Sequence, residues 1–159
     1  MTQPQTPRSV YAAALMLALG NIIWVLLDNQ PQPIVDPYVE KIFNLVAGLR
    51  ENNWIEYPRT VYWASIGPRP PLYQLLAAPW VLIFGRSVDS ILVVNSLFVA
   101  LLSICTYLIT QRFTAKRYAI LAMVMVVSLP IQAHLNSLAR PHAIVAAISA
   151  LLILQSLRT

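Results

Sequence analysis

The chain has 159 residues, of which 58% are hydrophobic and 11% charged, and its mean hydropathy is +0.63. A soluble domain is nearer half apolar and a quarter charged, so this composition excludes an ordinary soluble globular protein and indicates a membrane protein. The net charge of +5 comes from basic residues scattered along the chain. This scatter argues against a nucleic-acid partner and fits the positive ends of membrane helices.

Residues 9–27, "SVYAAALMLALGNIIWVLL", contain no charged side chain and have the length of one bilayer crossing. Arg8 precedes the run, but the run is long for a signal peptide and no small-x-small cleavage site follows it. We therefore interpret it as a retained first span. Asn21 is its one strongly polar side chain, and we expect it to bond to a neighbouring helix.

Residues 28–87 hold most of the acidic residues and several prolines, so we expect a loop outside the hydrocarbon. Within it, residues 36–50 have the chemistry of a helix start, with Asp36 as N-cap and Pro37 at the first helical position. Apolar residues then recur at three- and four-residue steps. This pattern predicts an amphipathic helix that lies at the membrane surface or against other helices.

The stretch "RPPLYQLLAAPWVLIFGRS" predicts a second helix in this loop, over residues 70–85. From Pro71 to Phe84 it provides roughly 21 Å of helix against about 30 Å of hydrocarbon, which is short for a span. We therefore expect it to lie along the membrane surface. Its aromatic residues, with one from earlier in the loop, fit an interfacial aromatic belt: Trp63, Tyr73 and Trp80.

Three further apolar runs follow, at residues 88–111, 118–135 and 141–157. Pro130 lies inside the second run and is expected to kink that helix or end it early. Cys105 cannot form an intrachain disulfide because it is the only cysteine, and a buried packing role is expected. The predicted fold is thus an all-α polytopic membrane protein, a single module with four transmembrane helices and two interfacial amphipathic helices in its first extracytoplasmic loop.

Charge placement predicts which loops face the cytoplasm. With four spans, the N-terminal side receives five basic residues and no acid: Arg8, Arg112, Lys116, Arg117 and Arg158. The other side receives the remaining basic residues and all six acidic ones. Because cytoplasmic loops carry an excess of Lys and Arg, we expect an inner- or plasma-membrane protein with a cytoplasmic N-terminus and its first long loop outside the cytoplasm.

The outer face then gathers many polar and charged side chains at the level of the lipid headgroups: Asp28, Asp36, Glu40, Arg59, Arg69, Arg86, Asp89, His134, Arg140 and His142. The two histidines have no fixed short spacing, so no metal site and no cofactor are predicted. Asp28 and Asp36 leave a divalent cation, shared with phosphate oxygens, as an open alternative.

The order of motifs resembles the N-terminal module of GT-C-type membrane glycosyltransferases, the group that includes protein O-mannosyltransferases and aminoarabinose transferases. In that group "D-E-A-x-Y" opens a first-loop helix, "K/H-P-P-L-Y" a second and "A-R-P-D" a later span. Here "VDPYVEK", "RPPLYQLLAAPW" and "LARPHAIVAAIS" occupy these places, and the resemblance runs from about residue 10 to 157. Pro37 replaces the family's glutamate, and His142 replaces its later aspartate.

The resemblance implies transfer of a sugar from a polyprenyl-phosphate carrier in the membrane lipid to an acceptor hydroxyl on a protein, lipid or glycan. Asp36 matches the carboxylate that accepts the proton of the attacking hydroxyl. Arg69 and Arg140 match positions suited to the leaving phosphate, and Arg86 and His142 are further candidate contacts. Because such enzymes have more spans, we also expect the 159 residues to be the N-terminal part of a longer, or truncated and inactive, enzyme.

Each candidate also has a structural interpretation. Asp36 is well placed as a helix N-cap, Arg69 and Arg86 fit anchors at the ends of an interfacial helix, and Arg140 and His142 flank a helix start. The alternative hypothesis is therefore a non-enzymatic polytopic membrane protein, such as an assembly partner or a transporter fragment.

Overall fold

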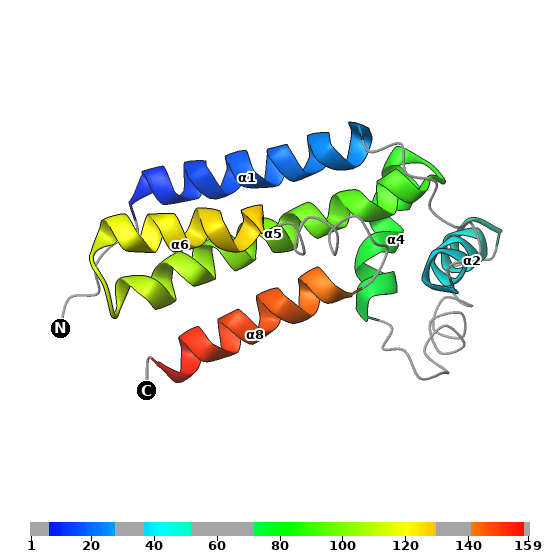
Figure 1. Cartoon of the computed structure of the whole chain (residues 1–159). Coiled ribbons are helices and arrows are strands. Elements are labelled where there is room, and N and C mark those ends of the chain that lie inside the picture. The colour runs from blue at the N-terminus through cyan, green and yellow to red at the C-terminus, as the bar shows by residue number, and fades with distance from the viewer. Residues whose placement is uncertain (1–6, 28–36, 52–71, 130–140, 158–159) are drawn as a thin grey trace.

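The computed structural model describes residues 7–27, 37–51, 72–129 and 141–157. Within these ranges the chain forms helices and no strands, which confirms the all-α prediction (Figure 1). The helices are α1 (Arg8–Leu27), α2 (Pro37–Glu51), α4 (Leu72–Phe84), α5 (Val88–Gln111), α6 (Lys116–Ser128) and α8 (His142–Ser156). The bounds of each helix lie within a few residues of those of a predicted segment. The exception is α6, which ends before the predicted run at 118–135 does.

The end of α6 follows from local backbone chemistry. The helix stops at Ser128, and Leu129 is already extended, with φ −61° and ψ 131°. The residue before a proline is disfavoured in the helical region, and Pro130 follows directly. The helix therefore ends early at Pro130, which is one of the two outcomes predicted. Residues 130–135 of the predicted span lie outside the described ranges.

Helix α5 is the centre of the bundle, because α1, α6 and α8 all pack against it. Figure 1 shows these four helices side by side, with α4 lying across them at one end and α2 beyond it. At the other end, a buried cluster joins the start of α1 to the last half of α5 and to α6: Val10, Tyr107, Ala119 and Met123. Cys105 is buried in the contact between α5 and α8, as expected.

Helix α2 packs against α4 as its sequence pattern predicts. Val39, Ile42 and Val46 are buried together with Ala77 and Val81 of α4, whereas Glu40 is exposed. Tyr73 differs from the expectation. It is 1% exposed and belongs to this cluster, so it packs in the core and is not part of an interfacial belt.

The buried polar contact predicted for α1 is present. Asn21 donates from Nδ2 to Oγ of Ser96 on α5 over 2.9 Å, and both side chains are buried. The same face of α1 carries Ala14 and Ala18, which are also buried. Small side chains let two helices approach closely, and a side-chain hydrogen bond then fixes their register.

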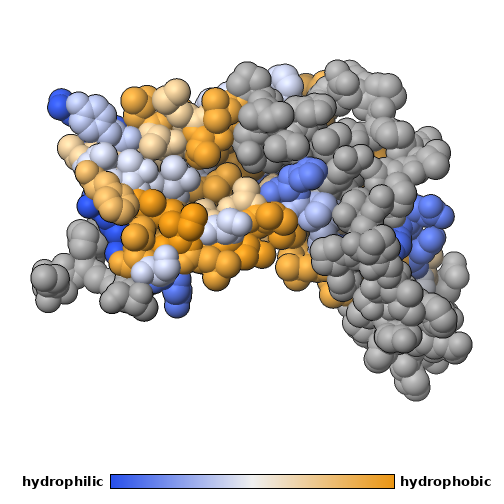
Figure 2. Space-filling view, turned by 60° about the horizontal axis from the view of Figure 1, so that its bottom comes forward, coloured by the Kyte–Doolittle hydropathy of each residue, from blue (hydrophilic) through white to orange (hydrophobic). Residues whose placement is uncertain are grey.

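Large apolar side chains cover much of the outer surface of the bundle. Those more than half exposed on α1, α6 and α8 include Leu15, Met16, Ile23, Leu121, Met125, Val145, Leu152 and Ile153. Figure 2 shows mostly hydrophobic atoms over the middle of one face and strongly hydrophilic ones at its left end. Apolar surface on this scale marks contact with a membrane or a partner.

Two described helices, α1 and α5, are long and apolar enough to cross a membrane, with 20 and 24 residues and mean hydropathies of 2.2 and 2.3. They reach roughly 30 and 36 Å at 1.5 Å per residue. The apolar helices α4 and α8 are shorter, at 13 and 15 residues. The count of four spans therefore stays a prediction.

The Asn21–Ser96 contact is testable by removing one hydroxyl group. Ser96→Ala should lower the free energy of unfolding in detergent micelles by about 0.5–1.7 kcal/mol, the range of interhelical hydrogen bonds in membrane proteins. Ser149→Ala removes the same group from an exposed position on α8 and should change stability little. Equal effects of the two substitutions would show that the hydrogen bond does not hold α1 on α5.

Candidate functional site

The structure describes two of the five predicted site residues, and they come from different elements. Arg86 is exposed in the link between α4 and α5, and its guanidinium carbon lies 4.8 Å from the centre of the Phe43 ring on α2. His142 is the exposed first residue of α8. Asp36, Arg69 and Arg140 lie outside the described ranges.

The position of Arg86 depends on a tight turn at Gly85. This residue has φ +96°, its N–H donates to the carbonyl of Val81 over 3.0 Å, and its own carbonyl accepts from the N–H of Ser87 over 3.0 Å. A positive φ is readily adopted by glycine because it lacks Cβ, and this is a common way to end a helix. The turn ends α4 and redirects the chain into α5.

Ser87 then caps α5. Its Oγ accepts the N–H of Ser90 over 3.1 Å and lies 2.8 Å from Oγ of Ser90. Asp89 occupies the first turn of α5 and is exposed, so its carboxylate lies near the positive end of the helix dipole. Ser87 was not among the predicted residues, although a serine directly before an apolar run is a standard N-cap signal.

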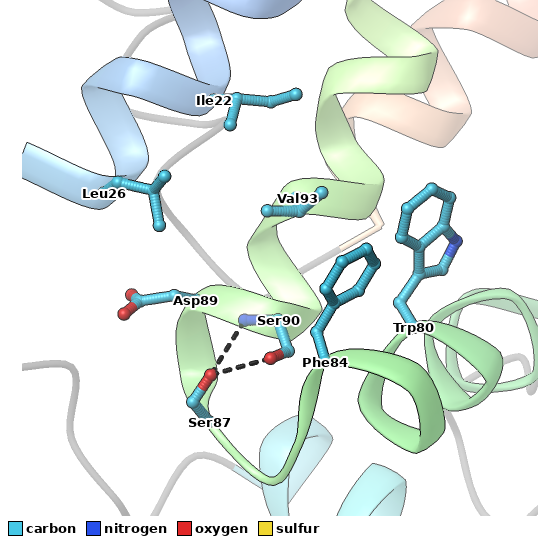
Figure 3. A pocket seen from close by; sticks show the side chains of 8 residues that line it. All are labelled: Ile22, Leu26, Trp80, Phe84, Ser87, Asp89, Ser90 and Val93. Atoms are coloured by element: carbon cyan, nitrogen blue, oxygen red, sulfur yellow. Dashed lines mark hydrogen bonds between the residues drawn. The ribbon is translucent and has the colours of Figure 1, made fainter.

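A cavity of about 450 Å³ lies beside this turn (Figure 3). It is enclosed by the last turns of α1 and α4 and the first turns of α5, through Ile22, Leu26, Trp80, Phe84, Ser87, Asp89, Ser90 and Val93. The rings of Trp80 and Phe84 are stacked, with centroids 5.6 Å apart. In Figure 3 the Asp89 carboxylate lies on the side of Leu26, and the two serines close the base.

Mostly apolar walls with a few polar groups are typical of small-molecule sites. Asp89 is the one charged side chain among the described residues that line this cavity. Its carboxylate repels a phosphate group and favours a hydrogen-bond donor. The cavity therefore suits the apolar part of an amphiphilic molecule whose polar end carries a hydroxyl or an amine.

A second cavity, of about 190 Å³, lies between the beginnings of α4 and α8. Its described walls are almost entirely apolar: Leu72, Tyr73, Pro141, Ile144, Val145, Ile148 and Ser149. Leu72 follows Arg69 by three residues, and Pro141 follows Arg140 directly. The structure thus brings together the two helix starts that follow the predicted phosphate-binding arginines.

Gln74, one residue beyond Tyr73, was not singled out from the sequence. Its side chain is fully buried, and neither Oε1 nor Nε2 has a hydrogen-bond partner in the described structure. An unsatisfied buried amide costs about 1–3 kcal/mol, so this side chain destabilises the contact in which it is buried. The sequence signal that could have identified Gln74 is a single amide side chain within the apolar stretch "LYQLLAAP".

No group of three His, Cys, Asp or Glu residues that could hold a metal ion is found within the described ranges. Asp28 and Asp36, the pair considered for a divalent cation, both lie outside them.

Comparison with known proteins gives no match to a protein-family model, a curated protein sequence or a solved structure. The resemblance to GT-C transferases therefore rests on the motifs in the sequence.

The Gly85 turn offers a test with a matched control. A Cβ would meet no atom within 4 Å at Gly85 or at Gly20, but only Gly85 has a positive φ. Gly85→Ala should therefore lower the free energy of unfolding by about 1–2 kcal/mol through backbone strain alone. Gly20→Ala, inside α1, should raise it by about 0.5–1 kcal/mol. Denaturant titration in micelles checks both, and a gain in stability for Gly85→Ala would contradict the turn.

Proposed function

We propose that the chain is a membrane-embedded module that crosses the bilayer with α1, α5, α6 and α8. The support is the exposed apolar surface of these helices and the absence of charged side chains from their interiors. As described, α6 and α8 reach about 20 and 22 Å, which is shorter than the hydrocarbon layer of about 30 Å.

The orientation that we propose follows from the ends of these helices. The beginnings of α1 and α6 and the end of α5 carry Arg8, Lys116, Arg117 and Arg112, and this end faces the cytoplasm by the positive-inside rule. Helices α2 and α4 then lie at the outer surface. The packing of α4 across the end of the bundle supports this arrangement (Figure 1).

We further propose that this module belongs to a GT-C-type glycosyltransferase, which passes a sugar from a polyprenyl-phosphate donor to an extracytoplasmic hydroxyl. The observation that carries this proposal is the shared cavity at the beginnings of α4 and α8. The helix starts that follow Arg69 and Arg140 in the sequence both line this cavity, which supports the proposal that these two residues act together. Paired guanidinium groups are suited to hold a phosphate through several charge-assisted hydrogen bonds.

In the proposed reaction, Asp36 accepts the proton of the acceptor hydroxyl while its oxygen attacks the anomeric carbon, and the bond from that carbon to the lipid phosphate breaks. Arg69 and Arg140 offset the charge that develops on the leaving phosphate. Arg86 is a further candidate contact. Its guanidinium carbon lies over the Phe43 ring, 4.8 Å from the ring centre, and a guanidinium that contacts an aromatic ring can still donate N–H bonds to a phosphate.

The larger cavity beside Asp89 suits the acceptor in this scheme. Its single carboxylate disfavours the phosphate of the donor, and its apolar walls suit the hydrocarbon of a lipid or an apolar peptide side chain. Donor and acceptor would thus be distinguished by charge, with cationic groups near one cavity and an acid at the other.

The second candidate is a non-enzymatic membrane protein. It is favoured by the position of Asp36 directly before α2, where a carboxylate serves as N-cap without any chemistry.

Asp36→Asn separates the two candidates, because asparagine caps a helix about as well as aspartate but cannot accept the proton. In membranes that hold the enzyme in its full-length context, we expect transfer of radiolabelled sugar from the polyprenyl-phosphate donor to fall about 10²–10⁴-fold. Glu40→Gln removes an exposed carboxylate from α2 and should leave transfer unchanged. Normal transfer by Asp36→Asn would remove the catalytic role and favour the second candidate.

A further inference from the structure

Four basic side chains from three segments converge at the end of the bundle opposite α2 and α4. The buried cluster of Val10, Tyr107, Ala119 and Met123 holds the start of α1, the last turns of α5 and the start of α6 together. The residues that flank this cluster form what we call the cationic end: Arg8, Arg112, Lys116 and Arg117. All four side chains are exposed.

No acidic residue lies among the described residues of the cationic end. The described acidic residues are on α2 and at the start of α5. Asp89 and Arg112 stand at opposite ends of α5, roughly 35 Å apart along the helix axis. That distance is several times the screening length of about 8 Å at physiological salt, so these acids do not neutralise the cationic end.

The hydrogen bonds at the cationic end leave its charge uncompensated. Arg112 donates to the carbonyl of Leu157 at the end of α8, and Arg117 donates to the hydroxyl of Tyr118 over 3.1 Å. Both acceptors are neutral. Lys116 and Arg117 also occupy the first turn of α6, where the helix dipole disfavours cations. The arrangement therefore costs free energy in the isolated chain and is relieved by external anions.

Aromatic side chains place this charge at a definite depth. Tyr11, Phe113 and Tyr118 flank the four cations and are 51%, 70% and 50% exposed. Tyrosine and other amphipathic rings concentrate at the level of the lipid headgroups, between hydrocarbon and water. Beside them, the guanidinium and ammonium groups reach the layer in which lipid phosphates lie.

We propose that the cationic end binds the headgroups of anionic phospholipids in the cytoplasmic leaflet. Guanidinium groups pair with phosphate oxygens through two parallel N–H bonds, and the ammonium of Lys116 adds a point charge. The inference rests on the proposed membrane embedding and is independent of glycosyl transfer. An inactive enzyme would still bind these lipids.

The test uses native mass spectrometry of the purified full chain in neutral detergent. It measures the preference for phosphatidylglycerol over phosphatidylcholine, as the ratio of the two lipid adducts. The double substitution Lys116→Gln, Arg117→Gln should lower the preference for phosphatidylglycerol by about 25-fold, or about fivefold for each charge. Arg112 is left in place because it bonds to Leu157. The parent's preference should fall as salt rises.

The matched control is Lys41→Gln, Arg50→Gln, which removes two cations of α2, one half-buried and one exposed, from the opposite end and should leave the preference unchanged. Lys116→Arg should also keep it, because the charge is retained. Equal losses in the two double variants would overturn the proposal, since the effect would then depend on net charge alone. Displacement of the lipid by millimolar inorganic phosphate would also overturn it, in favour of a site for free anions.

Discussion

The structure depends on one constraint, the cost of placing a charge where water cannot reach it. Every charged side chain on the four bundle helices lies at or next to a helix end, and the exposed faces of the helix interiors are largely apolar. In water such exposed faces would be unfavourable, whereas in hydrocarbon they lose nothing. The same constraint separates the chain into a cationic end and an end that carries α2, α4 and the cavities. The apolar surface of the bundle and the segregation of its charges both fit the proposed embedding in a membrane.

At the end that carries α2 and α4, helix packing and one tight turn position the residues that line the two cavities. The Gly85 turn reverses the chain from α4 into α5 and thereby sets the Trp80–Phe84 stack beside Ser87 and Asp89. The contact of α4 with the beginning of α8 creates the second, apolar cavity. The two cavities differ in their described linings, since the carboxylate of Asp89 lines one and no charged side chain is among the described residues that line the other.

The sequence predicts helices well here because length and hydropathy nearly determine them. The apolar runs, the amphipathic pattern of α2 and the hydrogen bond of Asn21 follow from local composition and from the cost of a lone amide among apolar side chains. Tyr73 was assigned to an interfacial belt and is buried instead, because its surroundings depend on α2 and α8, which no local pattern reveals. The cavities were not predictable for the same reason: Leu26, Trp80 and Val93 meet only through packing of helices far apart in sequence. The assignments of Asp36, Arg69 and Arg140 stay predictions.

The central claim is that the two ends of the bundle lie on opposite sides of a membrane. Labelling of single cysteines in intact cells tests this claim directly. Arg86 and Lys116 are each replaced by cysteine in a Cys105→Ala background, and the label is a membrane-impermeant maleimide. We expect position 86 to be labelled from outside, and position 116 only after the membrane is permeabilised. Labelling of both positions from the same side would contradict it, because the outer cavities and the cationic end would then share one compartment.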